Sequence, residues 1–223
     1  MKRYILKTVQ ADGSAYGNFQ WPLEVGAEVV APDWDPTPEC GGGLHGLLNG
    51  CGDGWLLNWS SDAKWIVAKV PKKAQMVDLG DKVKVDRCKV VHVGDQLSAT
   101  SFLSDRGCAG PIVGANVVTG DFGSATAGYC GSATAGDYGT ATAGNRGSAT
   151  AGDCGTATAG NYGSATAGYC GSATAGGGGT IQIRWWDGNR SSTAVGYVGD
   201  GGILPNVAYR VENGVLVEQR KEA

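Results

Sequence analysis

A set of cysteines and one histidine within the first hundred residues has side chains that could bind a metal ion or act as a nucleophile and its base. Cys40, His45, Cys51 and Cys88 supply four ligands of the types that Zn²⁺ prefers. Their spacing, C-x₄-H-x₅-C with a distant fourth ligand, matches no zinc motif, and there is no C-x₂-C. Cys40 and His45 are also the candidates for a nucleophile and a base, but no oxyanion-hole motif accompanies them. We therefore expect no metal, no cofactor and no enzymatic activity.

The stretch from Cys40 to Gly54 is rich in glycine and predicts a tight loop with buried cysteine and histidine side chains. It is not a phosphate-binding loop, because Gly50–Gly54 lacks the following Lys-Ser/Thr.

The elements around this loop predict a small α+β domain over residues 1–106. Asp95 is placed to cap a helix through about Ser104, with Leu97, Phe102 and Leu103 near one face, and residues 60–62 to cap a helical turn. Runs of β-branched and aromatic residues predict strands at Tyr4–Val9, Trp65–Val70 and Lys82–Val93. Five tryptophans are expected in the core: Trp21, Trp34, Trp55, Trp59 and Trp65.

Residues 123–178 are seven copies of the octad Gly-(Ser/Thr)-Ala-Thr-Ala-Gly-x-x. Eight is no multiple of the helical turn, whereas Ser/Thr-Ala-Thr-Ala alternates with the period of a strand. Strands separated by Gly-x-x-Gly corners are typical of a β-solenoid. Octads two to five alternate between two types: one has Ser and Asp, as at Ser132 and Asp137, and the next has Thr and Asn, as at Thr140 and Asn145. We therefore expect a true repeat of sixteen residues, with two octads per coil.

The alanines are expected inside a thin core, with larger residues plugging its ends. The corresponding positions hold Val117 before the octads and Ile181 and Ile183 after them. Beyond them, two hairpins are predicted to cap the solenoid, 181–186 with 193–198 and 209–211 with 215–217. The predicted fold is mainly β: an α+β domain (1–106), a solenoid (107–183) and a β-hairpin cap (184–223).

Two surfaces of this solenoid are candidates for binding. A hydroxyl face would include Thr140, Thr142, Thr156 and Thr158. In the sixteen-residue frame, corner side chains form an edge ladder suited to protein contact. Its residues are Tyr138, Cys154 and Cys170 along one edge, and Arg146 and Tyr162 along the other.

The charge and hydropathy of the sequence indicate which classes of partner to expect. The net charge is −3, with 18 basic and 21 acidic residues, and we expect no nucleic-acid partner. No apolar run approaches the length of a membrane span, and MKRYILKTVQADG lacks the features of a signal peptide. We expect a cytoplasmic protein that contacts no membrane and whose seven cysteines are thiols.

Three resemblances follow from these motifs. Ala-Gly-x-x-Gly-(Ser/Thr)-Ala-Thr resembles the octapeptide of bacterial ice-nucleation proteins and is similar to repeats in the heads of trimeric adhesins. The layout of Cys40–His45 (Cys-x-x-Gly-Leu-His), GDGWLLNWSSDAKWIVAKV, ATAG octads, IRWWDGNR and AVGYVGDGGILPN resembles an uncharacterised family of bacteria and their phages. The resemblance to ice-nucleation proteins implies ice binding. The resemblance to the bacterial and phage family implies no particular activity.

The function expected from the residues is a non-enzymatic binding or assembly module with a protein partner, forming a homodimer through the solenoid. The alternatives are a phage- or element-borne effector that binds a host protein, an ice-binding protein acting through the Ser/Thr face, and an enzyme using Cys40 and His45.

Overall fold

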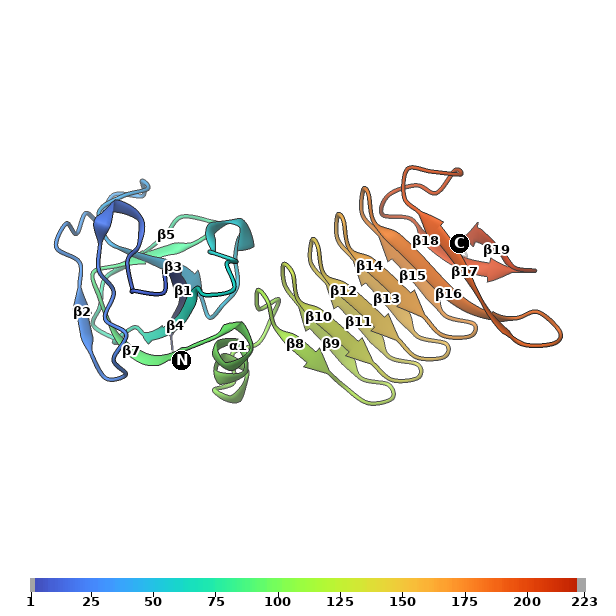
Figure 1. Cartoon of the computed structure of the whole chain (residues 1–223), viewed down its shortest axis with the longest axis horizontal. Helices are drawn as coiled ribbons and strands as arrows, with labels where there is room; N and C mark the ends of the chain where they lie inside the picture. The colour runs from blue at the N-terminus through green and yellow to red at the C-terminus, as the bar shows by residue number, and fades with distance from the viewer. Residues whose placement is uncertain (1–2, 220–223) are drawn as a thin grey trace. The chain divides into compact units, whose positions relative to one another are not determined.

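The computed structural model describes residues 3–219 and contains two compact units, Met1–Val113 and Gly114–Ala223 (Figure 1). The octads and both hairpins fall in the second unit, so the predicted cap is one compact body with the solenoid. Within residues 3–219, no helix is both long and apolar enough to span a membrane.

The first unit is a seven-stranded antiparallel sheet with helix α1 (Gln96–Asp105) packed against β4 and β7. Its strands lie in the order β2-β7-β4-β1-β3-β6-β5. Their bounds are β1 Tyr4–Val9, β2 Glu28–Val30, β3 Leu44–Leu48, β4 Lys64–Lys69, β5 Met76–Asp78, β6 Val83–Val85 and β7 Arg87–Gly94, with 3-10 turns η1 Tyr16–Asn18 and η2 Gly54–Leu56.

Local signals set most of these elements. Helix α1 begins after Asp95, whose carboxylate accepts a hydrogen bond from the Ser98 backbone N–H while the Ser98 hydroxyl accepts one from the Asp95 N–H. The strand predicted over 82–93 is divided at Asp86, because β6 pairs with β3 and β5 whereas β7 pairs with β2 and β4.

Three predictions for this unit are wrong. Residues 60–62 form a plain turn that leads directly into β4 and not a helical turn. Leu97 lies on the solvent side of α1, whereas Leu103 is fully buried. Trp55, in η2, is 63% exposed, while Trp21 and Trp65 are buried as expected. Tryptophan side chains are buried on average, but composition does not determine which tryptophan in a loop is exposed to solvent.

The second unit is a β-solenoid of about four coils with about sixteen residues per coil, as predicted. Residues sixteen apart pair in parallel and in register, for example Ala133 with Ala149 and Ala141 with Ala157. The odd sheet contains β9 Ser124–Ala127, β11 Thr140–Ala143, β13 Thr156–Ala159 and β15 Ser172–Ala175. The even sheet contains β8 Asn116–Val118, β10 Ser132–Ala135, β12 Ser148–Ala151, β14 Ser164–Ala167 and β16 Thr180–Trp186.

The core between the two sheets is built from alanine methyl groups. All fourteen octad alanines are at most 3% exposed. Ile181 and Ile183 fill the end of this core as predicted, joined by Tyr209, and Val117 is half-buried at the other end. Alanine buries little area, at about 25 cal/mol per Å². The backbone ladders and end plugs therefore carry much of the stability.

Antiparallel strands close the C-terminal end of both sheets. β17 (Ser191–Tyr197) pairs with β16, and β18 (Ala208–Glu212) pairs with β15 and with β19 (Val215–Glu218). These are the two predicted hairpin regions. They end the parallel stack, so the odd face has four coil strands.

The corner glycines allow the coils to approach each other. A Cβ on Gly155 would lie 2.8 Å from the Cβ of Ala151 and 3.0 Å from the Gly139 carbonyl oxygen of the preceding coil. A Cβ on Gly152 would overlap Oδ1 of Asp137. Glycine at both ends of each corner is therefore required by the stacking.

Candidate functional site: the hydroxyl faces and corner ladders of the solenoid

The outer face of each solenoid sheet carries two rows of hydroxyl groups. The first and third residues of each octad strand point away from the alanine core. Because the strands are parallel and in register, these residues align along the coil axis about 4.8 Å apart. Figure 1 shows the regular stacking of the strands on which these residues lie.

The odd sheet carries the threonine pairs predicted for the hydroxyl face. Thr140 pairs with Thr156, and Thr142 pairs with Thr158, so Thr-Ala-Thr occurs on two adjacent strands. Thr140 and Thr156 are exposed and the other two are half-buried, so both rows reach solvent. Ser-Ala-Thr borders them in β9 and β15, and the three octad strands of the even sheet are also Ser-Ala-Thr.

Each corner places a residue with a side chain in the left-handed region of backbone space. The φ values are 52° to 57° at seven successive corners. An L-residue there costs roughly 1–2 kcal/mol relative to the right-handed region, and glycine avoids this cost. Glycine occupies the equivalent position at the two ends of this series, Gly114 (φ 72°) and Gly178 (φ 66°). The seven residues are Phe122, Cys130, Tyr138, Arg146, Cys154, Tyr162 and Cys170.

The residue before each of these side chains links one coil to the next. Oδ1 of Asp137 accepts a hydrogen bond from the backbone N–H of Asp153 (2.8 Å), and Oδ1 of Asn145 accepts one from Asn161 (2.9 Å). In the same way, Oδ1 of Asp121, Asp153 and Asn161 accepts a hydrogen bond from the backbone N–H of the residue sixteen positions later. The donors are Asp137, Tyr169 and Gly177. The Asp/Asn alternation in the sequence is thus a pair of ladders, with aspartates along one edge and asparagines along the other.

The left-handed side chains form two edge ladders, in the arrangement that the sequence predicts. The first edge ladder contains Phe122, Tyr138, Cys154 and Cys170, and the second contains Cys130, Arg146 and Tyr162. The Phe122 and Tyr138 rings stack with their centroids 5.2 Å apart and their planes 7° apart. Cys154 lies next on this ladder, and its negative charge when ionised raises the pKa of Tyr138.

The aromatic residues of the ladders are exposed to solvent, Phe122 at 78%, Tyr138 at 61% and Tyr162 at 71% of their full accessible surface. The sequence prediction omitted Phe122 from the first ladder and Cys130 from the second. The signal was present, because Gly120-Asp121-Phe122-Gly123 has the form of the later corners. Cys154 and Cys170 are exposed free thiols.

The four candidate metal ligands of the first unit do not converge. Cys88 is buried opposite Val29, and burial raises the pKa of its thiol to about 12. Cys51 is half-buried, and burial raises the pKa of its thiol. No group of three histidine, cysteine or acidic side chains in residues 3–219 is placed to hold a metal ion. Only Cys40 and His45 share a pocket.

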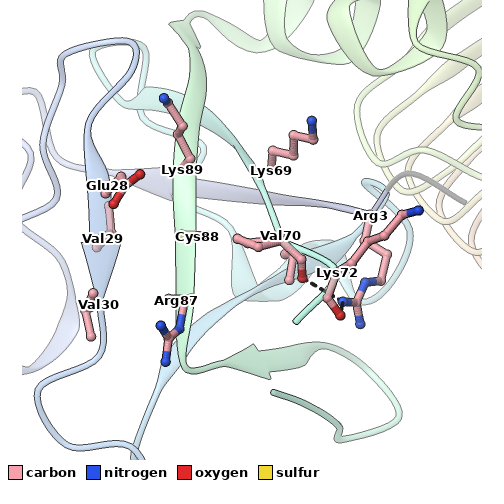
Figure 2. A pocket seen from close by; sticks show the side chains of 11 residues that line it. Arg3, Glu28, Val29, Val30, Lys69, Val70, Lys72, Arg87, Cys88 and Lys89 are labelled. Atoms are coloured by element: carbon pink, nitrogen blue, oxygen red, sulfur yellow. Dashed lines mark hydrogen bonds between the residues drawn. The ribbon is translucent and has the colours of Figure 1, made fainter. Parts of the chain in front are cut away.

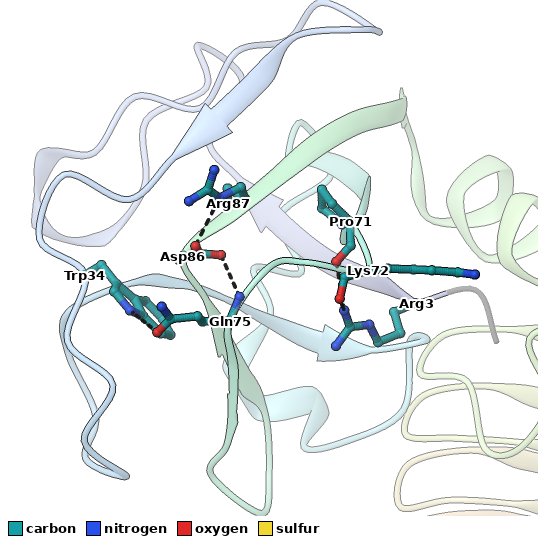
Figure 3. Close-up of polar contacts among 7 residues, drawn as sticks. All are labelled: Arg3, Trp34, Pro71, Lys72, Gln75, Asp86 and Arg87. Carbon is teal, nitrogen blue, oxygen red and sulfur yellow. Dashed lines mark hydrogen bonds and ion pairs between the residues drawn. The ribbon is translucent and has the colours of Figure 1, made fainter.

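A shallow basic trough of about 590 Å³ lies over β2, β7 and the end of β4. Figure 2 shows the ends of Lys69, Lys89 and Arg87 pointing in different directions. Two of its cations already have partners, as Figure 3 shows: Arg87 pairs with Asp86 at 3.0 Å, and Arg3 donates to the carbonyls of Pro71 (2.7 Å) and Lys72 (3.0 Å). The trough therefore has the character of a solvated sheet face.

The polar contacts beside this trough hold the loop that follows β2. The Asp86 carboxylate also accepts a hydrogen bond from the backbone N–H of Gln75 (3.0 Å), and the Gln75 side chain accepts one from the Trp34 indole (3.0 Å) (Figure 3). Trp34 in turn packs against Gly43, where a Cβ would lie 3.1 Å from the ring. This network fixes the glycine-rich segment that leads to His45.

Comparison with known proteins supports the resemblance of the octads. The chain is 36% identical over 107 residues to an ice nucleation protein of Pseudomonas syringae, 33% over 105 residues to one of Pseudomonas fluorescens, and 32% over 103 residues to ice nucleation protein InaU of Pantoea ananas. These matches cover 46–47% of this chain but only 8–10% of the relatives. No family model and no solved structure matches the chain.

Proposed function

We propose that the solenoid binds ice through the hydroxyl face of the odd sheet. The observation that carries the proposal is the in-register pair of Thr-Ala-Thr strands, β11 and β13, bordered by Ser-Ala-Thr on both sides. The similarity of just under half of the chain to proteins named for ice nucleation supports the same reading.

This face has the physical properties that an ordered water layer needs. Its outward residues on β9, β11, β13 and β15 are serines and threonines, so no charge there imposes its own hydration shell. Threonine presents a hydroxyl, which hydrogen-bonds to water, next to a methyl group that does not. Backbone ladders hold β11, β13 and β15 on both sides and the edge strand β9 on one side, so the spacing of the hydroxyl groups is regular. Water molecules ordered by this spacing lose little further entropy when they join ice.

The size of the array predicts adsorption to existing ice and not nucleation. Four strands span three steps of about 4.8 Å, or roughly 14 Å. The antiparallel pairing of β15 with β18 ends the array. A patch of this size contacts too few water molecules to template a crystal on its own, whereas it is large enough to attach to one already growing.

The experiment compares two variants at the same octad position. Thr142→Lys places a charge in the odd face, and Thr150→Lys places it in the even face, at an equally half-buried site. We expect the purified chain to partition into a growing ice front and to slow crystal growth, Thr142→Lys to lose both effects, and Thr150→Lys to keep them at equal thermal stability. Equal activity of both variants, or no activity of the parent chain, would refute the proposal.

The edge ladders favour a second function, contact with a protein partner and, in the simplest case, with a second copy of this chain. Phe, Tyr, Arg and Cys occupy seven left-handed corners at which glycine would cost less backbone strain. Tyrosine and arginine are enriched at interfaces, and the aromatic members of the ladders are exposed. Retention of strained, exposed side chains is explained if these side chains are used for binding.

A further inference from the structure

A second pocket of the first unit, of about 430 Å³, combines cationic side chains with an apolar floor. Lys7 of β1, His45 of β3 and Lys82, which precedes β6, line it. Leu47, Leu56 and Leu57 provide the apolar part, and Cys40 lies at its rim. The volume is within the range of pockets that hold small organic molecules. We call this the Lys7 pocket.

The Lys7 pocket concentrates positive charge that its own lining does not neutralise. None of its lining residues is acidic. Burial lowers the pKa of Lys7, and the nearby Lys82 ammonium lowers it further. Burial is also the main cause that lowers the pKa of His45, followed by the charges of Lys82, Lys7 and Lys84, while Asp33 has the opposite effect. These groups repel each other, and an anion between them would relieve that repulsion.

A second observation also indicates a missing ligand. Nε2 of His45 is buried and has no hydrogen-bond partner among residues 3–219. A buried polar atom left in this state costs free energy, and such atoms are often partnered by a ligand, water or an ion. The other histidine, His92, differs, because its Nε2 lies 3.1 Å from the Ser98 hydroxyl.

The pocket is preformed. Lys84, beside His45 on the paired strand β6, is 1% exposed. Its ammonium donates hydrogen bonds to the carbonyl oxygens of Glu39 (2.8 Å) and Gly41 (3.0 Å), and the Lys82 ammonium lies 3.3 Å from Cys40 Sγ. The loop that carries Cys40 is therefore held by Lys84 of β6 and by Lys82 just before that strand, so little ordering entropy is lost when a ligand enters.

We propose that the Lys7 pocket binds a small organic anion, whose carboxylate or phosphate group lies between Lys7 and Lys82 and whose apolar part packs on Leu47 and Leu57. Two lysine ammoniums suit either acidic group, because lysine acts as a point charge with rotatable donors. The bound anion favours protonation of His45, so binding strengthens as the pH falls toward the pKa of that imidazole.

The experiment uses the full chain and follows the ring protons of its two histidines by NMR. The probes are inorganic phosphate, acetate and hexanoate at millimolar concentration. We expect a saturable upward shift of the His45 pKa with phosphate or hexanoate, tighter binding of hexanoate than of acetate, and no change at His92. If only phosphate saturates the pocket, the ligand carries a phosphate group. If only hexanoate saturates it, the ligand carries a carboxylate. Absence of saturation with all three probes, or equal shifts at both histidines, overturns the proposal.

Variants locate the site. Lys7→Met and Lys82→Met retain the length of the side chain without its charge, and each should weaken binding about tenfold. Lys89→Met, on the exposed face of β7, should leave binding unchanged. Loss of binding in all three variants would indicate a general charge effect and overturn the proposal.

A readout in the unsubstituted chain covers the case in which a lysine variant fails to fold. Alkylation of the exposed Cys40 by iodoacetamide should slow when the better-binding probe saturates the pocket, while alkylation of Cys154 in the solenoid should not. Equal rates at Cys40 with and without the probe contradict binding at this site.

Discussion

Replacing Tyr162 by glycine separates the cost of a left-handed corner from the use of its side chain. Tyr162 has a φ of 56° and is 71% exposed. Its ring lies over Gly178 of the next coil, where an added Cβ would be 2.8 Å from the ring. The substitution removes this small contact and the backbone strain together.

The strain term dominates the expected change in stability. Relief of the left-handed conformation contributes about 1–2 kcal/mol. The greater freedom of glycine in the unfolded chain opposes it by about 0.4–1 kcal/mol. Tyr162→Gly should therefore leave the free energy of unfolding unchanged or raise it by up to about 1.5 kcal/mol, the reverse of what removal of an aromatic residue ordinarily does.

Tyr197 provides the matched control. It is 61% exposed but lies in β17, paired with Thr180, where glycine fits poorly. Tyr197→Gly should destabilise the protein by about 1–2 kcal/mol, so the two variants should differ by about 2 kcal/mol, or roughly 8 °C in Tm for a unit of this size.

Thermal unfolding and sedimentation measure the two consequences. We expect Tyr162→Gly to melt at or above the parent temperature and to lose self-association, and Tyr197→Gly to melt lower and still associate. If Tyr162→Gly is destabilised as much as Tyr197→Gly, the strain argument is wrong. If it is stable and still associates as the parent does, the second edge ladder is not the contact surface.

Two further predictions concern stability. Ile181→Ala, at a fully buried end plug, should cost about 2–5 kcal/mol in urea unfolding, whereas Val195→Ala, at an exposed site, should cost under about 1 kcal/mol; equal small costs would mean that the plug is dispensable. Burial lowers the pKa of His45 and of His92 in the folded protein, so the unfolded chain binds protons first as the pH falls below about 6.5, and the free energy of unfolding should decrease there. His45→Gln should flatten this dependence when unfolding is measured on both sides of that pH, and an unchanged slope would contradict it.

The solenoid was predictable because its signals are local and repeated. The alternation of Ser/Thr with Ala within each octad predicted the strands, and the alternation of two octad types predicted two octads per coil. Ile181 and Ile183 indicated where the alanine core ends. The left-handed position within each corner was not predictable, since Gly-x-x-Gly offers two glycines and the strain falls on neither of them. The hydrogen-bonded Asp and Asn ladders also required coordinates, although the alternation that produces them was visible.

The first unit was less predictable because its contacts join distant segments. Lys7 and Lys82 are far apart in the sequence and have no shared motif, yet the pairing of β1 with β3 and of β3 with β6 brings them to one pocket. Cys40 and His45 were identified by residue type, and the structure places them in that same pocket. Cys51 and Cys88 were grouped with them by type alone, and the sheet places Cys88 in a separate buried environment.

The outer threonine of the octads is a residue that packing within the fold does not explain. The third strand residue is threonine in all seven octads, whereas the two corner residues change from copy to copy, so the copies have diverged elsewhere. The coil itself does not require threonine there: the same outward position is Val118 in β8, paired with Thr134, and Gln182 in β16, paired with Thr166. Packing therefore does not require threonine at this position. On the odd sheet, we propose that contact with ice retains it.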